Sequence, residues 1–336
     1  MSITKKICSK IYRETKYWSR DIGYALGLNE RFFENARGNR IVIYHGICQQ
    51  DHTRFNPIFL TKETFEAHLK LYKKYFNVLS LDGFYQQRFS KKKFNICLTF
   101  DDGFANNYKY VLPLLEAYKM PAAFFITGIR EAGYDVLWND FLGVVSKYGP
   151  KTIHYKNERY DKGRYDKYTS TQSDITLAEK LRSTGFTEKE EMMKLLYPLV
   201  PFKKNTSEQD YWLQMTSEQI QILARSPLVT IGAHGYYHND LSKIKIAEAA
   251  KEMVQSKEYL ENLTAKQVNS LAFPYGAYNL SVVEEAKKAG YSQLLTMDFH
   301  FEGNKDDDMM RERFTVNPFI SPINQMYATI TRGYEH

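Results

Sequence analysis

The sequence has little cysteine, no long apolar run and only a small excess of charge. Its three cysteines, Cys8, Cys48 and Cys97, form neither a C-x-x-C pair nor zinc-knuckle spacing, so we expect them to be reduced and structural. Nowhere do 18 uncharged apolar residues follow one another, and the first twenty residues lack the apolar stretch of a secretion signal. The sequence therefore predicts a protein without a membrane span, and a cytoplasmic location is the default expectation.

The positive charge is modest, because 46 Lys and Arg residues face 39 Asp and Glu residues and leave a net charge of +7. This excess suits an anionic glycan, a phospholipid surface or a nucleic acid, and it does not choose among them. No helix-turn-helix, RNP or zinc-finger pattern accompanies the charge, so nucleic-acid binding is not expected.

Residues 1–38 are expected to form a separate N-terminal arm. Within it, Ile3, Ile7 and Ile11 recur every four positions among basic residues, which is typical of a basic amphipathic helix. Two interpretations stay open for the arm: it rests on an anionic membrane face, or it packs across one end of the main domain. Residues 39–336 are expected to form that domain.

Beyond the arm, short β-type runs alternate with helical segments. The strand-like runs are residues 41–44, 96–100, 122–126, 229–231, 268–273 and 292–296. Helix starts are indicated by Thr61, by a capping box of Thr216 with Gln219, and by Asn279. This order predicts parallel strands with crossover helices, as in an α/β barrel or a doubly wound sheet. Residues 139–215 break the rhythm, and we expect them to be an inserted, mainly helical lid.

The strongest chemical signal follows the apolar run 98–100, which ends in Asp101, Asp102 and Gly103. Side chains just past the carboxyl ends of parallel strands face the ligand crevice. One carboxylate there can bind a metal ion while the other takes up a proton. A simple Asp-Asp-Gly turn is the competing interpretation.

Two further strand ends carry matching signals. His234 and His238 follow the run 229–231, and their spacing lets two imidazoles reach one ion if the residues between them form a helical turn. The run 268–273 ends in Pro274-Tyr275-Gly276, a sharp turn that leaves backbone N–H groups free to bind an oxyanion. Each signal alone also suits an ordinary turn or a surface pair, but three together are much harder to attribute to chance.

With these motifs the sequence resembles the polysaccharide deacetylase family, carbohydrate esterases that include chitin, chitooligosaccharide and peptidoglycan deacetylases. The T-F-D-D-G motif matches at 99–103, and the ligand positions of H-[S/T]-x-x-H match at His234 and His238. The resemblance covers roughly residues 40–335. It implies a distorted (β/α)7 barrel and the removal of N-acetyl groups from an amino-sugar glycan.

The resemblance also implies residue roles. Asp101 would be the general base, and Asp102, His234 and His238 would ligate a divalent ion, with Zn²⁺ expected and Co²⁺, Ni²⁺ or Mn²⁺ as alternatives. The backbone N–H of Tyr275 would help to hold the oxyanion.

The sequence departs from the family pattern at two places. Most members have an Arg two residues before the Pro of the third motif, where it orients the catalytic Asp, but here that residue is Ala272. The run 272–276 instead resembles the A-[Y/F]-P-Y-G version of a subset that acts on poly-N-acetylglucosamine, and Arg313 is a candidate for the missing guanidinium. The family's late L-x-H histidine, its general acid, has no clear match. His45, after the first strand, is the favoured substitute and His300 is the second.

Trp138, in a segment that resembles the family's W-x-D, is a candidate wall of the sugar site, or simply a packed residue. Three functional hypotheses follow from the whole pattern. The first is an N-deacetylase of an amino-sugar glycan or its precursor. The second is a deformylase or deacetylase of a lipid-linked sugar, which the basic arm favours. The third is a catalytically decayed barrel that binds glycan, suggested by the two departures.

Overall fold

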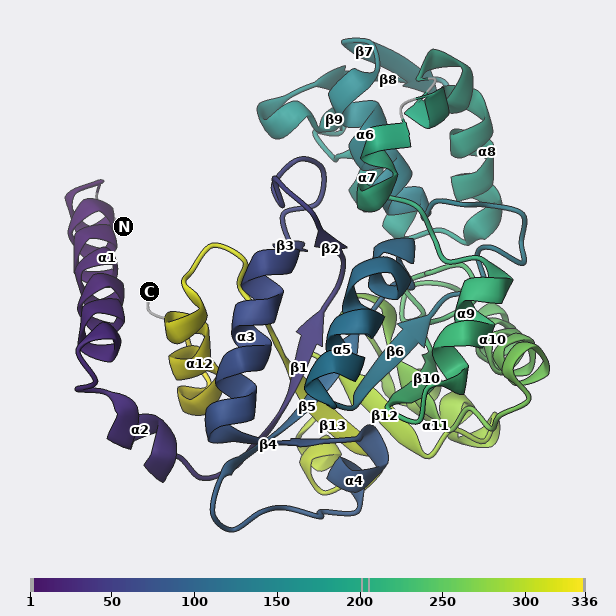
Figure 1. The fold of residues 1–336 in the computed structure, drawn as a ribbon. Helices are drawn as coiled ribbons and strands as arrows, with labels where there is room; N and C mark the ends of the chain where they lie inside the picture. Colours follow the sequence, from purple (N-terminus) through teal and green to yellow (C-terminus); the bar gives the residue numbers. More distant parts are fainter. Residues whose placement is uncertain (1–2, 201, 205, 335–336) are drawn as a thin grey trace.

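Seven parallel strands close into a barrel at the centre of the molecule (Figure 1). The computed structural model describes residues 3–200, 202–204 and 206–334, the side chains of 3–7 and 206–207 excepted. Around the barrel the order is β1 (Asn39–Tyr44), β13 (Met310–Thr315), β12 (Gln293–Thr296), β11 (Ser270–Ala272), β10 (Val229–Ala233), β6 (Ala122–Ile126) and β5 (Phe94–Phe100), and β5 pairs again with β1. An eighth parallel strand, β4 (Phe76–Leu79), pairs with β5. The expected (β/α)7 barrel is confirmed.

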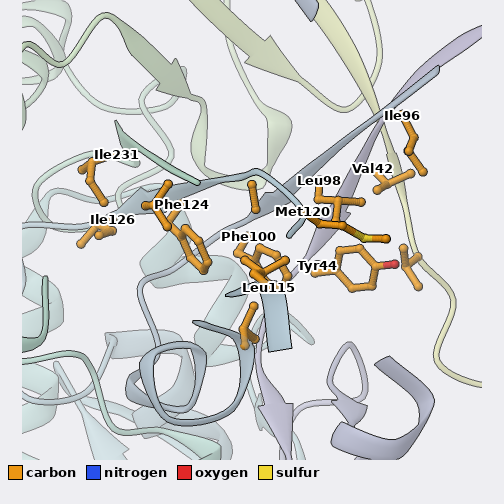
Figure 2. Packing of buried hydrophobic residues seen from close by; sticks show 14 of the residues in the cluster. Val42, Tyr44, Ile96, Leu98, Phe100, Leu115, Met120, Phe124, Ile126 and Ile231 are labelled. Atoms are coloured by element: carbon orange, nitrogen blue, oxygen red, sulfur yellow. The ribbon is translucent and has the colours of Figure 1, made fainter. Parts of the chain in front are cut away.

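Side chains of the barrel strands alternate between its two faces. Tyr44 of β1 and Leu98 and Phe100 of β5 point outward and join the large apolar cluster of Figure 2. Ile41 of β1 and Cys97 of β5, which have the opposite parity, belong to a second cluster inside the barrel. This alternation continues along β5, so the inward set reaches the end of the strand at the position that Asp101 occupies.

Helices surround the barrel (Figure 1). They are α3 (Lys62–Tyr75), α4 (Leu81–Tyr85), α5 (Leu112–Tyr118) with a preceding π-helical turn η1 (Asn107–Val111), α9 (Ser217–Arg225), α10 (Ile246–Thr264), α11 (Leu280–Lys288) and α12 (Pro322–Thr331). One of them, α4, lies at the lower end of the barrel in Figure 1 and adds Leu81 and Phe84 to the inner cluster. Three of the expected helix starts are correct: Thr61, Thr216 and Asn279 each cap a helix, and Thr216 and Gln219 form the reciprocal capping box.

Residues 139–215 are mainly helical, but they also contain a small sheet that the sequence did not indicate. Their elements are α6 (Trp138–Tyr148), the antiparallel strands β7 (Thr152–Tyr155), β8 (Glu158–Lys162) and β9 (Tyr168–Ser170), the helices α7 (Leu177–Arg182) and α8 (Phe186–Leu196), and the 3₁₀ turns η2 (Arg164–Asp166), η3 (Tyr197–Leu199), η4 (Phe202–Lys204) and η5 (Thr206–Tyr211). In Figure 1 this insertion stands above the barrel, next to the loop that carries β2 (Ile47–Cys48) and β3 (Leu60–Thr61).

The N-terminal arm consists of α1 (Ile3–Ala25) and α2 (Glu30–Asn35). The α1 helix lies to one side of the barrel and is tied to α12, where the Asn324 amide donates to the Tyr17 carbonyl (3.0 Å) and to the Asp21 carboxylate (3.1 Å). The α2 helix buries Phe33 in the main core. In the described part of the chain, none of the helices combines the length and the apolar character that crossing a membrane requires.

Candidate active site

The two adjacent carboxylates lie at the end of β5, and both are buried. The Asp101 N–H donates to the Tyr44 carbonyl (3.0 Å), so pairing with β1 continues through this residue. Asp102 and Gly103 then adopt left-handed backbone angles, with φ of 74° and 78°. Such a conformation is strained for a residue with a side chain. The chain therefore turns one residue earlier than Gly103 alone would require, and both acids face the same mouth of the barrel.

Asp102 lies next to both histidines of the second motif. Its Oδ1 is 3.3 Å from His234 Nε2 and 3.2 Å from His238 Nε2, and the three groups are buried. One ligand atom from each lies within 4.8 Å of the others. Burial by itself raises the pKa of Asp102, but the two imidazoles outweigh burial and hold this pKa well below its ordinary value.

This donor set fits a divalent cation. The carbonyl of Ala272 accepts a hydrogen bond from His234 Nδ1 (2.8 Å), so the proton of that imidazole is on Nδ1 and its Nε2 keeps a lone pair for an ion. Two imidazoles and one carboxylate leave positions open for water and substrate, as in catalytic zinc sites. Asp102, His234 and His238 therefore form a possible metal site.

The histidines are not brought together by the expected helical turn. Residues 234–238 form an irregular bend in which Gly235 and His238 have φ of 72° and 56°. The α10 carboxylate Glu252 holds this bend by accepting from the Tyr237 N–H (2.9 Å) and from the Asn239 side-chain amide (2.7 Å). Burial raises the pKa of Glu252.

The insertion also contacts this bend. Lys189 of α8 is buried, donates to the Asn239 side chain and lies 4.7 Å from the centre of the Trp138 ring. Burial lowers the pKa of Lys189 to about 8. Trp138 is only 2% exposed and donates its indole N–H to the His238 carbonyl (3.2 Å), so it supports the bend and does not wall an open site.

Asp101 forms a bidentate ion pair with Arg313 of β13. The guanidinium makes two hydrogen bonds to the two carboxylate oxygens, at 2.7 and 2.8 Å, and both side chains are buried. Burial raises the pKa of Asp101, but Arg313 and His234 outweigh burial and lower this pKa below its ordinary value. Ala272 lies inside the barrel, and Arg313 provides the guanidinium that this position lacks.

The two candidates for the general acid, His45 and His300, occupy different surroundings. His45 is half-buried and follows Tyr44, whose carbonyl accepts from the Asp101 N–H, so it lies at the same mouth. Burial lowers the pKa of His45 more than the carboxylates raise it. His300 is exposed and stacks on Tyr278, with ring centres 4.6 Å apart.

Tyr275 occupies the third strand end, in the turn η6 (Pro274–Gly276), with a left-handed φ of 62°. Gly276 and Ala277 use their N–H groups within the turn, whereas the N–H of Tyr275 meets no acceptor in the described part of the chain. The Tyr275 ring packs against His238, with centres 4.7 Å apart, and Arg182 of α7 lies over the ring at 4.4 Å. The N–H of Tyr275 thus stays available at this strand end, and the Tyr275 ring lies beside His238.

Comparisons with known proteins bear on the family and the fold of the chain. Residues 89–294 match the family model described as polysaccharide deacetylase. The chain is 22% identical to the poly-beta-1,6-N-acetyl-D-glucosamine N-deacetylase of Escherichia coli (strain K12) over 241 residues, which are 70% of this chain and only 30% of that relative.

Two solved structures are similar in fold. One is the Streptococcus pyogenes deacetylase PplD in complex with acetate, with a TM-score of 0.53 at 18% identity over 86% of this chain and 97% of that one. The other is IcaB from Ammonifex degensii, with a TM-score of 0.52 at 15% identity over 88% and 97% of the two chains.

The donor geometry predicts one divalent ion per chain. We expect His234→Ala and His238→Ala each to lose most of it, because two remaining ligands cannot complete the site. Metal content is measured by plasma mass spectrometry after dialysis against Zn²⁺ and then against buffer. The exposed His154 of β7 provides the matched control, since His154→Ala should keep the ion. Full occupancy in both site variants would refute the ligand assignment.

Proposed function

The chain belongs to the polysaccharide deacetylase family, and from this premise we propose that it is a metal-dependent hydrolase that removes N-acetyl groups from an amino-sugar glycan or glycan precursor. The observation that carries the proposal is the pairing of a candidate Asp-His-His metal site with a second carboxylate, Asp101, held beside it by Arg313. The relative that acts on poly-beta-1,6-N-acetyl-D-glucosamine, together with the run 272–276, supports that polymer as the substrate class.

An amide resists attack by neutral water, so the site must supply a nucleophile and stabilise negative charge. A divalent ion held by Asp102, His234 and His238 would lower the pKa of a bound water and polarise the acetyl carbonyl. Zn²⁺ is the proposed ion, with Co²⁺, Ni²⁺ and Mn²⁺ as alternatives, because imidazole and carboxylate ligands suit all four.

The chain's own groups then handle protons and charge. Asp101 accepts the proton of the attacking water, and the bidentate contact with Arg313 keeps this carboxylate ionised and aimed. The free N–H of Tyr275 donates to the oxyanion. We propose that His45 protonates the departing amine, because it shares the barrel mouth with the carboxylates whereas His300 stacks on Tyr278. The products are a free amino sugar and acetate.

A second candidate function is deacetylation or deformylation of a lipid-linked sugar. On α1 the residues Ile11, Trp18 and Ile22 share one helical face, and the first two are 60% and 67% exposed. Lys10 and Arg13 lie on the same helix, a combination that suits an anionic membrane surface. The side chains of Ile3 and Ile7 lie outside the described residues. A cytoplasmic location with peripheral membrane contact stays a prediction.

A decayed, glycan-binding barrel is not favoured. A site without turnover has no use for a carboxylate that is oriented by two hydrogen bonds next to a metal triad. Glycan is therefore the proposed partner as a substrate, and nucleic acid is not proposed as a partner.

The proposed division between the two acids predicts different outcomes for isosteric variants. Metal-loaded wild type should release acetate from N-acetylglucosamine oligomers. Lipid-linked sugars are tested as alternative substrates in parallel, and both released acetate and released formate are measured. Asp101→Asn should keep the ion and lose turnover, whereas Asp102→Asn should lose the ion as well. Equal metal loss in the two variants would show that the roles are assigned incorrectly.

If His45 is the general acid, the His45→Gln variant should still fold and bind the metal ion. Its kcat should fall by about 10²–10⁴-fold, the usual effect of removing acid–base assistance. Steady-state kinetics with the same oligomers measures the change, and His300→Gln is the comparison variant. Near-wild-type kcat in His45→Gln would reject the assignment, and a large loss in His300→Gln would transfer the role there.

The arm predicts binding to phosphatidylglycerol vesicles that salt weakens, because Lys and Arg would contact the headgroups. The double variant Ile11→Ala/Trp18→Ala should no longer co-sediment with these vesicles. Leu199→Ala/Phe319→Ala, which removes two exposed apolar side chains elsewhere, should bind as wild type does. Wild type that stays in the supernatant would contradict membrane contact.

A further inference from the structure

A small cavity lies between the insertion and the loop before β3. It has a volume of about 210 Å³ and is lined by Phe55, Asn56, Asn139, Asp140, Gly143 and Tyr211. Pockets for drug-sized ligands measure roughly 300–1,000 Å³, so this one admits a single small ring rather than a length of polymer. None of its lining residues belongs to the site described above.

The cavity contains polar groups that have no partner within the described part of the protein. Asp140 is buried, and one of its oxygens accepts a 3.3 Å hydrogen bond from the Asn56 amide, while its other oxygen has none. The side-chain oxygen of Asn139 is also buried and unpaired. Buried polar atoms without partners are costly, so an unpaired carboxyl oxygen and amide oxygen together point to a polar ligand that forms hydrogen bonds with both.

The rest of the lining suits a sugar. Phe55 and Tyr211 contribute two aromatic rings that pack on each other with centres 5.3 Å apart, and the Tyr211 hydroxyl is already used in a bond to the Gln50 carbonyl. A pyranose ring has an apolar C–H face that packs on aromatic rings and a rim of hydroxyl groups that bonds to carboxyl and amide side chains. A hydrophobic or strongly charged ligand would match only one half of this lining.

The cavity adjoins the residues that support the metal ligands. Asp140 follows Trp138 by two residues, and the Trp138 indole N–H donates to the His238 carbonyl (3.2 Å). Burial, together with the charge of Asp102, raises the pKa of Asp140 well above its ordinary value. A neighbouring cavity of about 520 Å³ shares Phe55, Asn139 and Gly143 with the small one. The two cavities thus lie next to each other along α6.

We propose that this cavity is a sugar subsite, in which Asp140 and Asn139 bind the hydroxyl groups of the residue next to the one that loses its acetyl group. The inference rests on the proposed function for its substrate class, an N-acetylhexosamine oligomer. Asp140 and Asn139 act as specificity-determining residues here, since they do not touch the reacting atoms.

Two kinds of variant test the subsite. Asp140→Ala removes the hydrogen-bonding group and should raise KM for a β-1,6-linked N-acetylglucosamine trimer about tenfold, while Asp140→Asn keeps a donor and an acceptor of the same shape and should largely rescue it. Gly143→Leu fills the cavity without removing a polar group. A Cβ at Gly143 meets only the Phe55 carbonyl, at 4.0 Å, and Leu is the better helix former, so this variant should fold.

The expected pattern depends on substrate length. KM for the trimer should rise in Asp140→Ala and Gly143→Leu with little change in kcat, while kcat/KM for methyl N-acetyl-β-glucosaminide should stay at the wild-type value, because a single sugar does not reach the subsite. Ser146→Ala, on the same helix α6 but lining only the larger cavity, is the matched control. Unchanged KM for the trimer in both site variants, or equal losses with both substrates, would overturn the subsite.

Calorimetric titration of metal-loaded Asp101→Asn with the trimer separates this inference from the proposed function. If wild type releases no acetate, the proposed function fails. The subsite then stands only if the trimer binds to Asp101→Asn and Gly143→Leu in that background weakens binding at least tenfold. The subsite is refuted if the trimer does not bind, or if Gly143→Leu leaves the affinity for the trimer unchanged.

Discussion

Two neighbouring buried carboxylates are the constraint on which the rest of the structure depends. Charges out of water are stable only when they are paired and hydrogen-bonded, and two acids side by side repel each other unless separate cations balance them. Asp101 is balanced by Arg313 through two hydrogen bonds. Asp102 is turned away from that ion pair by its left-handed backbone and meets His234 and His238 instead. The division of roles between the acids follows from this division of partners.

Backbone strain occurs in each of the three motifs of the site. Asp102, His238 and Tyr275 all have positive φ, and each belongs to one of the three motifs at the mouth of the barrel. Strain of this kind persists only where the surroundings over-determine it. The surroundings include the insertion, because Trp138 and Lys189 hold the bend of the two histidines from one side and Arg182 covers the Tyr275 ring. Residues 139–215 are therefore part of the site's support.

Much of this arrangement could be predicted from the sequence, since strand ends in a parallel barrel converge. Asp101, Asp102, His234, His238 and Tyr275 each follow an apolar run, and the structure brings them to one mouth. The guanidinium at Arg313 was also anticipated, from its place in a late strand and the alanine at 272.

What could not be predicted depends on contacts between residues far apart in the chain. Lys189 and Glu252 are separated by more than sixty residues, and neither lies in a motif, so no spacing indicates that both bind Asn239. The helical turn expected between the histidines was wrong because Gly235 allows a bend that the i, i+4 spacing does not reveal. The strands β7 to β9 are only three to five residues long and lie in Lys- and Tyr-rich sequence, where alternation is hard to detect.

The central claim is that one carboxylate is held by Arg313 for proton transfer while the other is held for the metal. The most direct measurement is the metal content and acetate release of Arg313→Gln, determined on the same preparation. The account predicts one divalent ion per chain and a fall in kcat of about 10²-fold or more, because Asp101 loses its orientation while the triad is untouched. Loss of the ion, or turnover equal to wild type, would contradict it.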